Sequence, residues 1–88
     1  MSGTQYRVEL IPAARRQLRK LDQKVAQRLL PALEDLKSEP RPPGCRAMTG
    51  QPGRWRIRVG DYRVVYQIDD DIVLVLVVTI AHRREAYR

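Results

Sequence analysis

Cysteine and histidine are nearly absent from this sequence, and their scarcity excludes two kinds of site. The 88 residues include one cysteine, Cys45, and one histidine, His82. A disulfide within the chain needs two cysteines, and a zinc site built from nitrogen and sulfur ligands needs more of both residue types. We therefore expect no intrachain disulfide and no such zinc centre, and a reducing compartment suits the chain.

Long apolar runs are also missing. The longest lies at residues 72–80 and is far too short to cross a bilayer, and the first residues lack the charged-then-apolar pattern of a signal peptide. We therefore expect a cytoplasmic protein with no membrane partner. A chain of this length has room for one small core, so we expect a single domain over residues 1–88.

Positive charge is plentiful by comparison. Seventeen lysines and arginines against ten aspartates and glutamates give a net charge of +7. The excess is concentrated, because residues 41–68 contain six arginines and one aspartate. This balance favours a nucleic acid, a ribosome or an acidic protein as partner.

The first half of the chain shows one alternating segment and two helical ones. Residues 5–10 alternate apolar and polar side chains, which predicts a strand. Pro12 suits the first turn of a helix, where no amide donor is needed. Asp22 can cap a second helix, which Pro31 should either kink or divide in two. The apolar face of that helix would consist of Val25, Leu29, Leu33 and Leu36.

The second half predicts a loop followed by three strands. Residues 39–53 are rich in proline and glycine. Residues 55–66 alternate as a hairpin, and residues 72–80 are typical of a strand buried on both faces. The order predicts an α+β fold, a small antiparallel sheet with a helical hairpin packed on one face. The first strand must join the sheet, because its backbone groups would otherwise be unpaired.

Arginines occupy the polar face of the predicted hairpin. Strict alternation puts Arg56 and Arg58 on the face opposite the apolar residues of the same strand. If Gly60-Asp61 is a two-residue turn, Arg58 pairs directly with Arg63. Arginines facing each other repel and do not stabilise a sheet. They can be an ordinary solvated face or a preorganised site for phosphate, and we favour the phosphate site because guanidinium groups match phosphate oxygens and stay charged.

The aromatic residues and the histidine near this hairpin have simpler interpretations. Trp55 and Tyr66 share a face with apolar residues, so we expect them in the core rather than stacked on bases. Tyr62 is on the same face beside the turn, and its role stays open. A lone histidine such as His82, following a buried strand, is more often structural than catalytic.

These segments closely resemble the RelE family of bacterial toxins, within the RelE/ParE superfamily. The resemblance rests on the 55–66 hairpin, the acidic turn at 69–71, the apolar strand after it, and the run from His82 to Tyr87. The helical region at 18–36 also fits, so the resemblance covers nearly the whole chain.

The resemblance implies the toxin of a type II toxin–antitoxin pair, a ribosome-dependent endoribonuclease that cuts mRNA in the decoding site and inhibits translation. The implied partners are the ribosome, mRNA and a cognate antitoxin protein that keeps the toxin inactive. The implied chemistry needs no metal and no cofactor: the ribose 2′-hydroxyl attacks the adjacent phosphate, leaving a 2′,3′-cyclic phosphate and a 5′-hydroxyl.

The family's catalytic positions are matched by Arg56, Arg58, Arg63, Arg83 and Tyr87. By this resemblance, Arg63 and Arg56 would stabilise the charge of the pentavalent phosphorane, and Arg58 would hold the scissile phosphate. Tyr87 would accept the 2′-hydroxyl proton, and neighbouring cations would have to lower its pKa from about 10. Arg83 would stabilise the leaving 5′-oxygen by its charge, because guanidinium is a poor acid.

Two alternatives and two departures from the family pattern accompany this hypothesis. A ParE-like protein would inhibit DNA gyrase without cutting RNA, and an inactive relative would act only through its antitoxin as a DNA-binding repressor. His82 is a better proton donor than Arg83 in principle, but its place at a strand end ranks it lower. Ala81 stands where many relatives have glycine. Arg56 and Arg58 stand where many relatives have lysine, and arginine keeps the positive charge of lysine but has no proton-transfer role.

Overall fold

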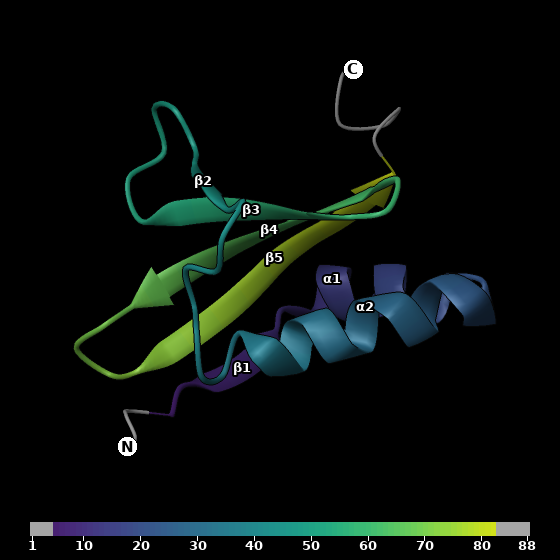
Figure 1. Cartoon of the computed structure of the whole chain (residues 1–88), viewed down its shortest axis with the longest axis horizontal. Coiled ribbons are helices and arrows are strands. Elements are labelled where there is room, and N and C mark those ends of the chain that lie inside the picture. The colour runs from purple at the N-terminus through teal and green to yellow at the C-terminus, as the bar shows by residue number, and fades with distance from the viewer. Residues whose placement is uncertain (1–4, 83–88) are drawn as a thin grey trace.

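The computed structural model describes residues 5–82 and shows two helices lying on one face of a five-stranded sheet (Figure 1). This arrangement confirms the predicted α+β fold with a helical hairpin on one face. The elements in chain order are β1 (Arg7–Leu10), α1 (Pro12–Arg19), α2 (Gln23–Asp35), β2 (Arg46–Ala47), β3 (Arg54–Val59), β4 (Tyr62–Asp69) and β5 (Leu74–His82).

Both helices begin where the sequence predicts. Pro12 is the first residue of α1, and Asp22 is the N-cap residue of α2, although its side chain makes no capping hydrogen bond. Pro31 lies inside α2 without dividing it. Proline removes one helical hydrogen bond, so packing of the apolar face must hold the helix together. That face contains the buried residues Leu29 and Leu33.

The sheet is mixed, which corrects the expectation of an antiparallel sheet. The strand order is β1-β5-β4-β3-β2, and β1 runs parallel to β5 while the other neighbours are antiparallel. A parallel pair needs a crossover connection, and the helical hairpin with the loop after it provides one between β1 and the rest of the sheet. β1 does join the sheet, as its unpaired backbone groups require.

The core lies between the helices and one face of the sheet. Its fully buried side chains come from both layers: Leu29, Leu36, Val64, Tyr66, Val75 and Val77. A bulge between Val65 and Tyr66 shifts the register of β4 on β5. Among the described residues, no helix of this structure is long and apolar enough to cross a membrane.

β5 differs from its prediction in both bounds and burial. The strand begins at Leu74 rather than at Ile72, whose side chain is 57% exposed, and it continues to His82. Alternate residues such as Val75 and Val77 are buried, while their neighbours are only half-buried. The helices cover one face of the sheet, so the apolar run was wrongly interpreted as a strand buried on both faces.

Candidate functional site

The β3–β4 hairpin has the register that its sequence predicts. Val59 pairs with Tyr62, and Arg58 pairs directly with Arg63. Gly60 takes a φ of +62° at the turn, whereas Asp61 keeps a negative φ. This pattern is that of a type II′ turn, whose twist matches that of the flanking strands. The turn therefore fixes the two arginines side by side.

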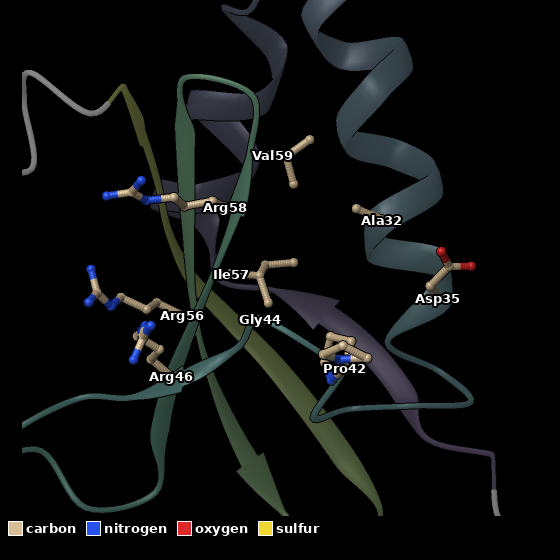
Figure 2. Close-up of a pocket in the computed structure, with 10 residues that line it drawn as sticks. Ala32, Asp35, Pro42, Gly44, Arg46, Arg56, Ile57, Arg58 and Val59 are labelled. Atoms are coloured by element: carbon tan, nitrogen blue, oxygen red, sulfur yellow. The ribbon is translucent and has the colours of Figure 1, made fainter.

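Five arginines lie on the face of the sheet opposite the helices, and we call the surface formed by four of them the arginine face. Figure 2 shows the side chains of Arg46, Arg56 and Arg58 directed to one side of β3, away from α2, while Ile57 points toward α2. Arg63 belongs to the same face because it is the cross-strand partner of Arg58. Arg54, two residues before Arg56 in β3, lies on the same side, where its Nη1 donates to the Oε1 of Gln51 over 3.2 Å. The arginine face is defined as Arg46, Arg56, Arg58 and Arg63.

The electrostatics of the arginine face favour an anion. Within residues 5–82, no carboxylate forms an ion pair with Arg46, Arg56 or Arg58. Arg46 and Arg58 are exposed, and Arg56 and Arg63 are half-buried, with the Nε atom of Arg63 buried. Guanidinium groups fixed on strands form a rigid set of donors for phosphate oxygens. The hollow beside Arg58 and Arg63 has a volume of only about 40 Å³, so a large ligand would bind across an open surface.

A larger cleft lies along the outer edge of β3, between this strand and α2, and Arg46, Arg56 and Arg58 also belong to its lining. Its volume is about 580 Å³. Ala32, Ile57 and Val59 give it an apolar wall, and Asp35 of α2 lies at its rim (Figure 2). Beyond Arg56, the outer edge of β3 has no neighbouring strand in the described part of the chain. Apolar walls beside an open strand edge suit a polypeptide segment better than a nucleotide.

The family of this chain follows from its likeness to known proteins. A model of the family described as ParE toxin of type II toxin-antitoxin system, parDE, matches residues 8–87. The chain is 33% identical over 84 residues to Toxin RelG of Mycobacterium tuberculosis, covering 94% of this chain and 97% of that protein.

Solved structures agree with this likeness. The RelBE2 toxin–antitoxin complex of M. tuberculosis matches with a TM-score of 0.81 and 30% identity, over 93% of this chain and 95% of that one. A chain of the intact Escherichia coli RelBE complex matches with a TM-score of 0.78 and 28% identity, over 88% of this chain and 95% of that one. The chain belongs to the RelE/ParE superfamily of type II toxins.

The aromatic residues and the histidine of this toxin lie on the helix side of the sheet. Tyr66 is fully buried in the core, where burial raises the pKa of its phenol and the neighbouring Cys45 adds to the rise. The rings of Tyr62 and His82 meet edge to face with centroids 5.3 Å apart. Because Tyr62 and Arg63 are consecutive in β4, this ring pair lies on the face opposite the arginine face. His82 is therefore directed away from the arginines.

The structure brings together three of the five predicted site residues of the toxin. Arg56, Arg58 and Arg63 share one face, as the alternation predicts. Arg83 and Tyr87 lie outside the described residues, so their place in the site stays a prediction. Residues 5–82 contain no group of three histidine, cysteine, aspartate or glutamate side chains placed to hold a metal ion.

Arg46 is the site residue that the sequence analysis missed. It belongs to β2, which pairs with β3 so that Arg46 lies directly opposite Arg56. The surrounding proline and glycine residues of 39–53 indicated a loop, and a two-residue strand gives no periodic signal. The one available signal was the short run Cys45–Met48 between two glycines, which is long enough to add a strand to the edge of β3.

Proposed function

We propose that this toxin is a ribosome-dependent endoribonuclease that cuts mRNA. The observation that carries the proposal is the arginine face, on which Arg58 and Arg63 lie directly opposite each other and Arg46 lies opposite Arg56. Like charges in these positions cost stability. A polyanion bound across them would compensate this cost, and the RNA-cleaving branch of the superfamily supplies such a ligand in mRNA.

We further propose different roles for the individual arginines, and the strand register supports this division. Arg58 and Arg63 are the pair on adjacent strands nearest the hairpin tip, so they would bind the scissile phosphate together. Their charges would stabilise the additional negative charge of the phosphorane when the ribose 2′-hydroxyl attacks. Arg56, paired with Arg46, would bind a neighbouring phosphate instead of sharing the scissile one with Arg63. In this proposal Tyr87 accepts the proton of the 2′-hydroxyl, and Arg83 stabilises the leaving 5′-oxygen.

A cognate antitoxin is the second partner that we propose. The relatives in the M. tuberculosis and E. coli complexes are bound to antitoxins. In this chain, the cleft between α2 and β3 offers apolar walls and an open strand edge within reach of the arginine face. An antitoxin segment with apolar and acidic side chains would fit this cleft and cover the arginines.

Primer extension on an mRNA held in purified ribosomes tests the nuclease directly. We expect wild-type protein to cleave in the decoding site, to leave a 2′,3′-cyclic phosphate, and to leave the same mRNA intact without ribosomes. A folded wild-type protein that does not cleave would refute the proposal. Cleavage of free mRNA would instead show a nuclease that reaches its substrate by another route.

A ParE-like inhibitor of DNA gyrase is the alternative, favoured by the family model that matches residues 8–87. This alternative gives no role to the arginine pairs as an RNA site. Gyrase supercoiling in the presence of the toxin separates the two proposals. Loss of supercoiling by a toxin that leaves ribosome-bound mRNA intact would establish the alternative.

A further inference from the structure

The loop between α2 and β2 is fastened to the turn between β4 and β5. Arg41 in this loop donates hydrogen bonds to both carboxylate oxygens of Asp70, with Nη2 3.0 Å from Oδ2 and Nη1 3.5 Å from Oδ1. The Tyr6 hydroxyl donates to Oδ1 of the same carboxylate over 2.6 Å. The hydrogen bonds from Arg41, which have the larger effect, and from Tyr6 lower the pKa of Asp70. Three segments far apart in the sequence therefore meet at one carboxylate.

Two further contacts hold the same loop against the sheet. The Arg41 guanidinium lies 5.1 Å from the centroid of the Trp55 ring in β3, within the range of a cation–π interaction. The Tyr66 hydroxyl donates a hydrogen bond to the Pro40 carbonyl oxygen over 2.8 Å. We call the group of Tyr6, Arg41, Trp55 and Asp70 the Arg41 clasp.

β2 needs support of this kind. It is only two residues long, and its pairing places Arg46 directly opposite Arg56. Two like charges on facing positions destabilise a strand pair, and so short a strand has few hydrogen bonds to offset the repulsion. Pairing with β3 alone therefore stabilises the position of β2 only weakly.

The Arg41 clasp fixes the point from which the chain enters β2. Arg41 precedes Arg46 by five residues, and a backbone hydrogen bond of 3.0 Å from the Cys45 amide to the Pro42 carbonyl oxygen tightens the connection. On the far side of β2, the Met48 amide donates to the Arg54 carbonyl oxygen over 2.9 Å. Fastening the loop upstream thus limits how far Arg46 can move from Arg56.

We propose that Arg41 and Asp70 are positioning residues that hold Arg46 beside Arg56, where Arg46 binds an RNA phosphate next to the scissile one. This inference rests on the proposed nuclease function. Neither residue needs to contact RNA for this role, because each acts through the placement of β2. Their effect is therefore on substrate binding and not on the chemical step.

The substitution Asp70→Asn tests the role of the clasp, with Glu34→Gln as matched control. Glu34 also forms an ion pair, 3.0 Å from Lys37, and both substitutions remove one exposed carboxylate charge. An exposed ion pair contributes modestly, so we expect Asp70→Asn to raise the KM for mRNA on ribosomes about two- to fivefold and to leave kcat unchanged. Glu34→Gln should change neither constant.

A double-mutant cycle with Arg46 distinguishes positioning from a general loss of structure. If Asp70 acts through Arg46, Asp70→Asn should have no further effect on KM in an Arg46→Ala background. Additive effects of the two substitutions would overturn the proposal. A drop in kcat for Asp70→Asn with unchanged KM would overturn it as well.

Hydrogen exchange of residues 46–48 gives a readout that does not depend on activity. We expect faster exchange of these amides in Asp70→Asn than in wild type or Glu34→Gln, together with a changed emission of Trp55, the only tryptophan of the chain. Unchanged exchange would refute the positioning role even if the toxin cleaves mRNA. Faster exchange in a toxin that does not cleave would confirm the clasp and refute only the nuclease.

Discussion

Arg63 is the residue on which the proposed chemistry depends most. It lies on β4, which has β3 and β5 as neighbours, so its backbone is fixed on both sides. Its Nε atom is buried, while its cross-strand partner Arg58 is exposed. Ala81 of β5 pairs with Arg63 on the other side and contributes only a methyl group there. A guanidinium held in this way is well placed to meet charge that develops in a transition state.

His82 has a structural role in this account. Its ring packs edge to face against Tyr62 on the helix side, away from Arg63. We expect His82→Ala to cleave ribosome-bound mRNA at the wild-type rate through the acidic pH range, and to lose about 1 kcal/mol of stability with the ring pair. Single-turnover rates measured against pH check this, and a variant slower than wild type at acidic pH, where a proton donor is most effective, would make His82 a proton donor.

At the level of elements, the β3–β4 hairpin is the part of the fold whose register the sequence predicts in detail. Strict alternation and the Gly60-Asp61 turn predicted every pair from Val59–Tyr62 to Ile57–Val64, because a two-residue turn leaves one register. β2 could not be predicted, because its two residues lie in a loop rich in proline and glycine and are placed by contacts distant in sequence. For the same reason, the place of Arg46 in the site was not predicted from the sequence.

The turn before β5 contains a residue in an unfavourable conformation. Val73 has a φ of +56°, in the left-handed region that a β-branched side chain rarely adopts. The chain turns at Val73, so the apolar run from residue 72 does not extend as one strand, and β5 begins at Leu74. The sequence predicted the acidic turn at 69–71 and the apolar run after it, but not that the turn extends through Val73.

We expect Val73→Asn to stabilise the toxin, because asparagine tolerates the left-handed region at lower cost. The gain in the free energy of unfolding should be about 0.5–1 kcal/mol. Urea denaturation of wild type, Val73→Asn and the control Ile72→Asn provides the measurement. Ile72 lies next to Val73 without a positive φ, so its substitution should give no such gain. Equal effects at both positions would show that Val73 is not strained.

For the whole molecule, one face of the sheet supplies stability and the other supplies charge. The helices and the core occupy one side (Figure 1), and the arginine face occupies the other (Figure 2). The sequence predicted this division for β1 and for the β3–β4 hairpin, where apolar and charged residues alternate, but not for β5, which was predicted to be buried on both faces. The parallel pairing of β1 with β5 could not be predicted from the sequence, since the direction of an edge strand depends on how the helices cross the sheet.

The Arg41 clasp makes stability depend on pH through Asp70. Its folded pKa lies below the unfolded value of about 3.9, so its contribution is present above that value and is lost as pH falls through the folded pKa. The groups around it are Tyr6, Arg41 and the neighbouring Asp69 and Asp71; the hydrogen bond to Asp70 raises the pKa of Tyr6, which stays protonated in this range.

Denaturation of wild type and Asp70→Asn at several pH values checks this dependence. We expect wild type to be the more stable protein from neutral pH down to about pH 5, and the difference to vanish as pH falls well below about 4. A difference that persists in strong acid would mean that the carboxylate charge is not what stabilises the loop.

The most direct test of the central claim is the single-turnover rate of Arg63→Ala on mRNA held in ribosomes, with Arg15→Ala as control. Arg15 is an exposed arginine of α1, a helix on the face opposite the arginine face, and its loss changes the net charge equally. We predict a fall of about 100-fold or more for Arg63→Ala and little change for Arg15→Ala. Equal rates for the two variants would contradict the claim that the arginine face carries the chemistry.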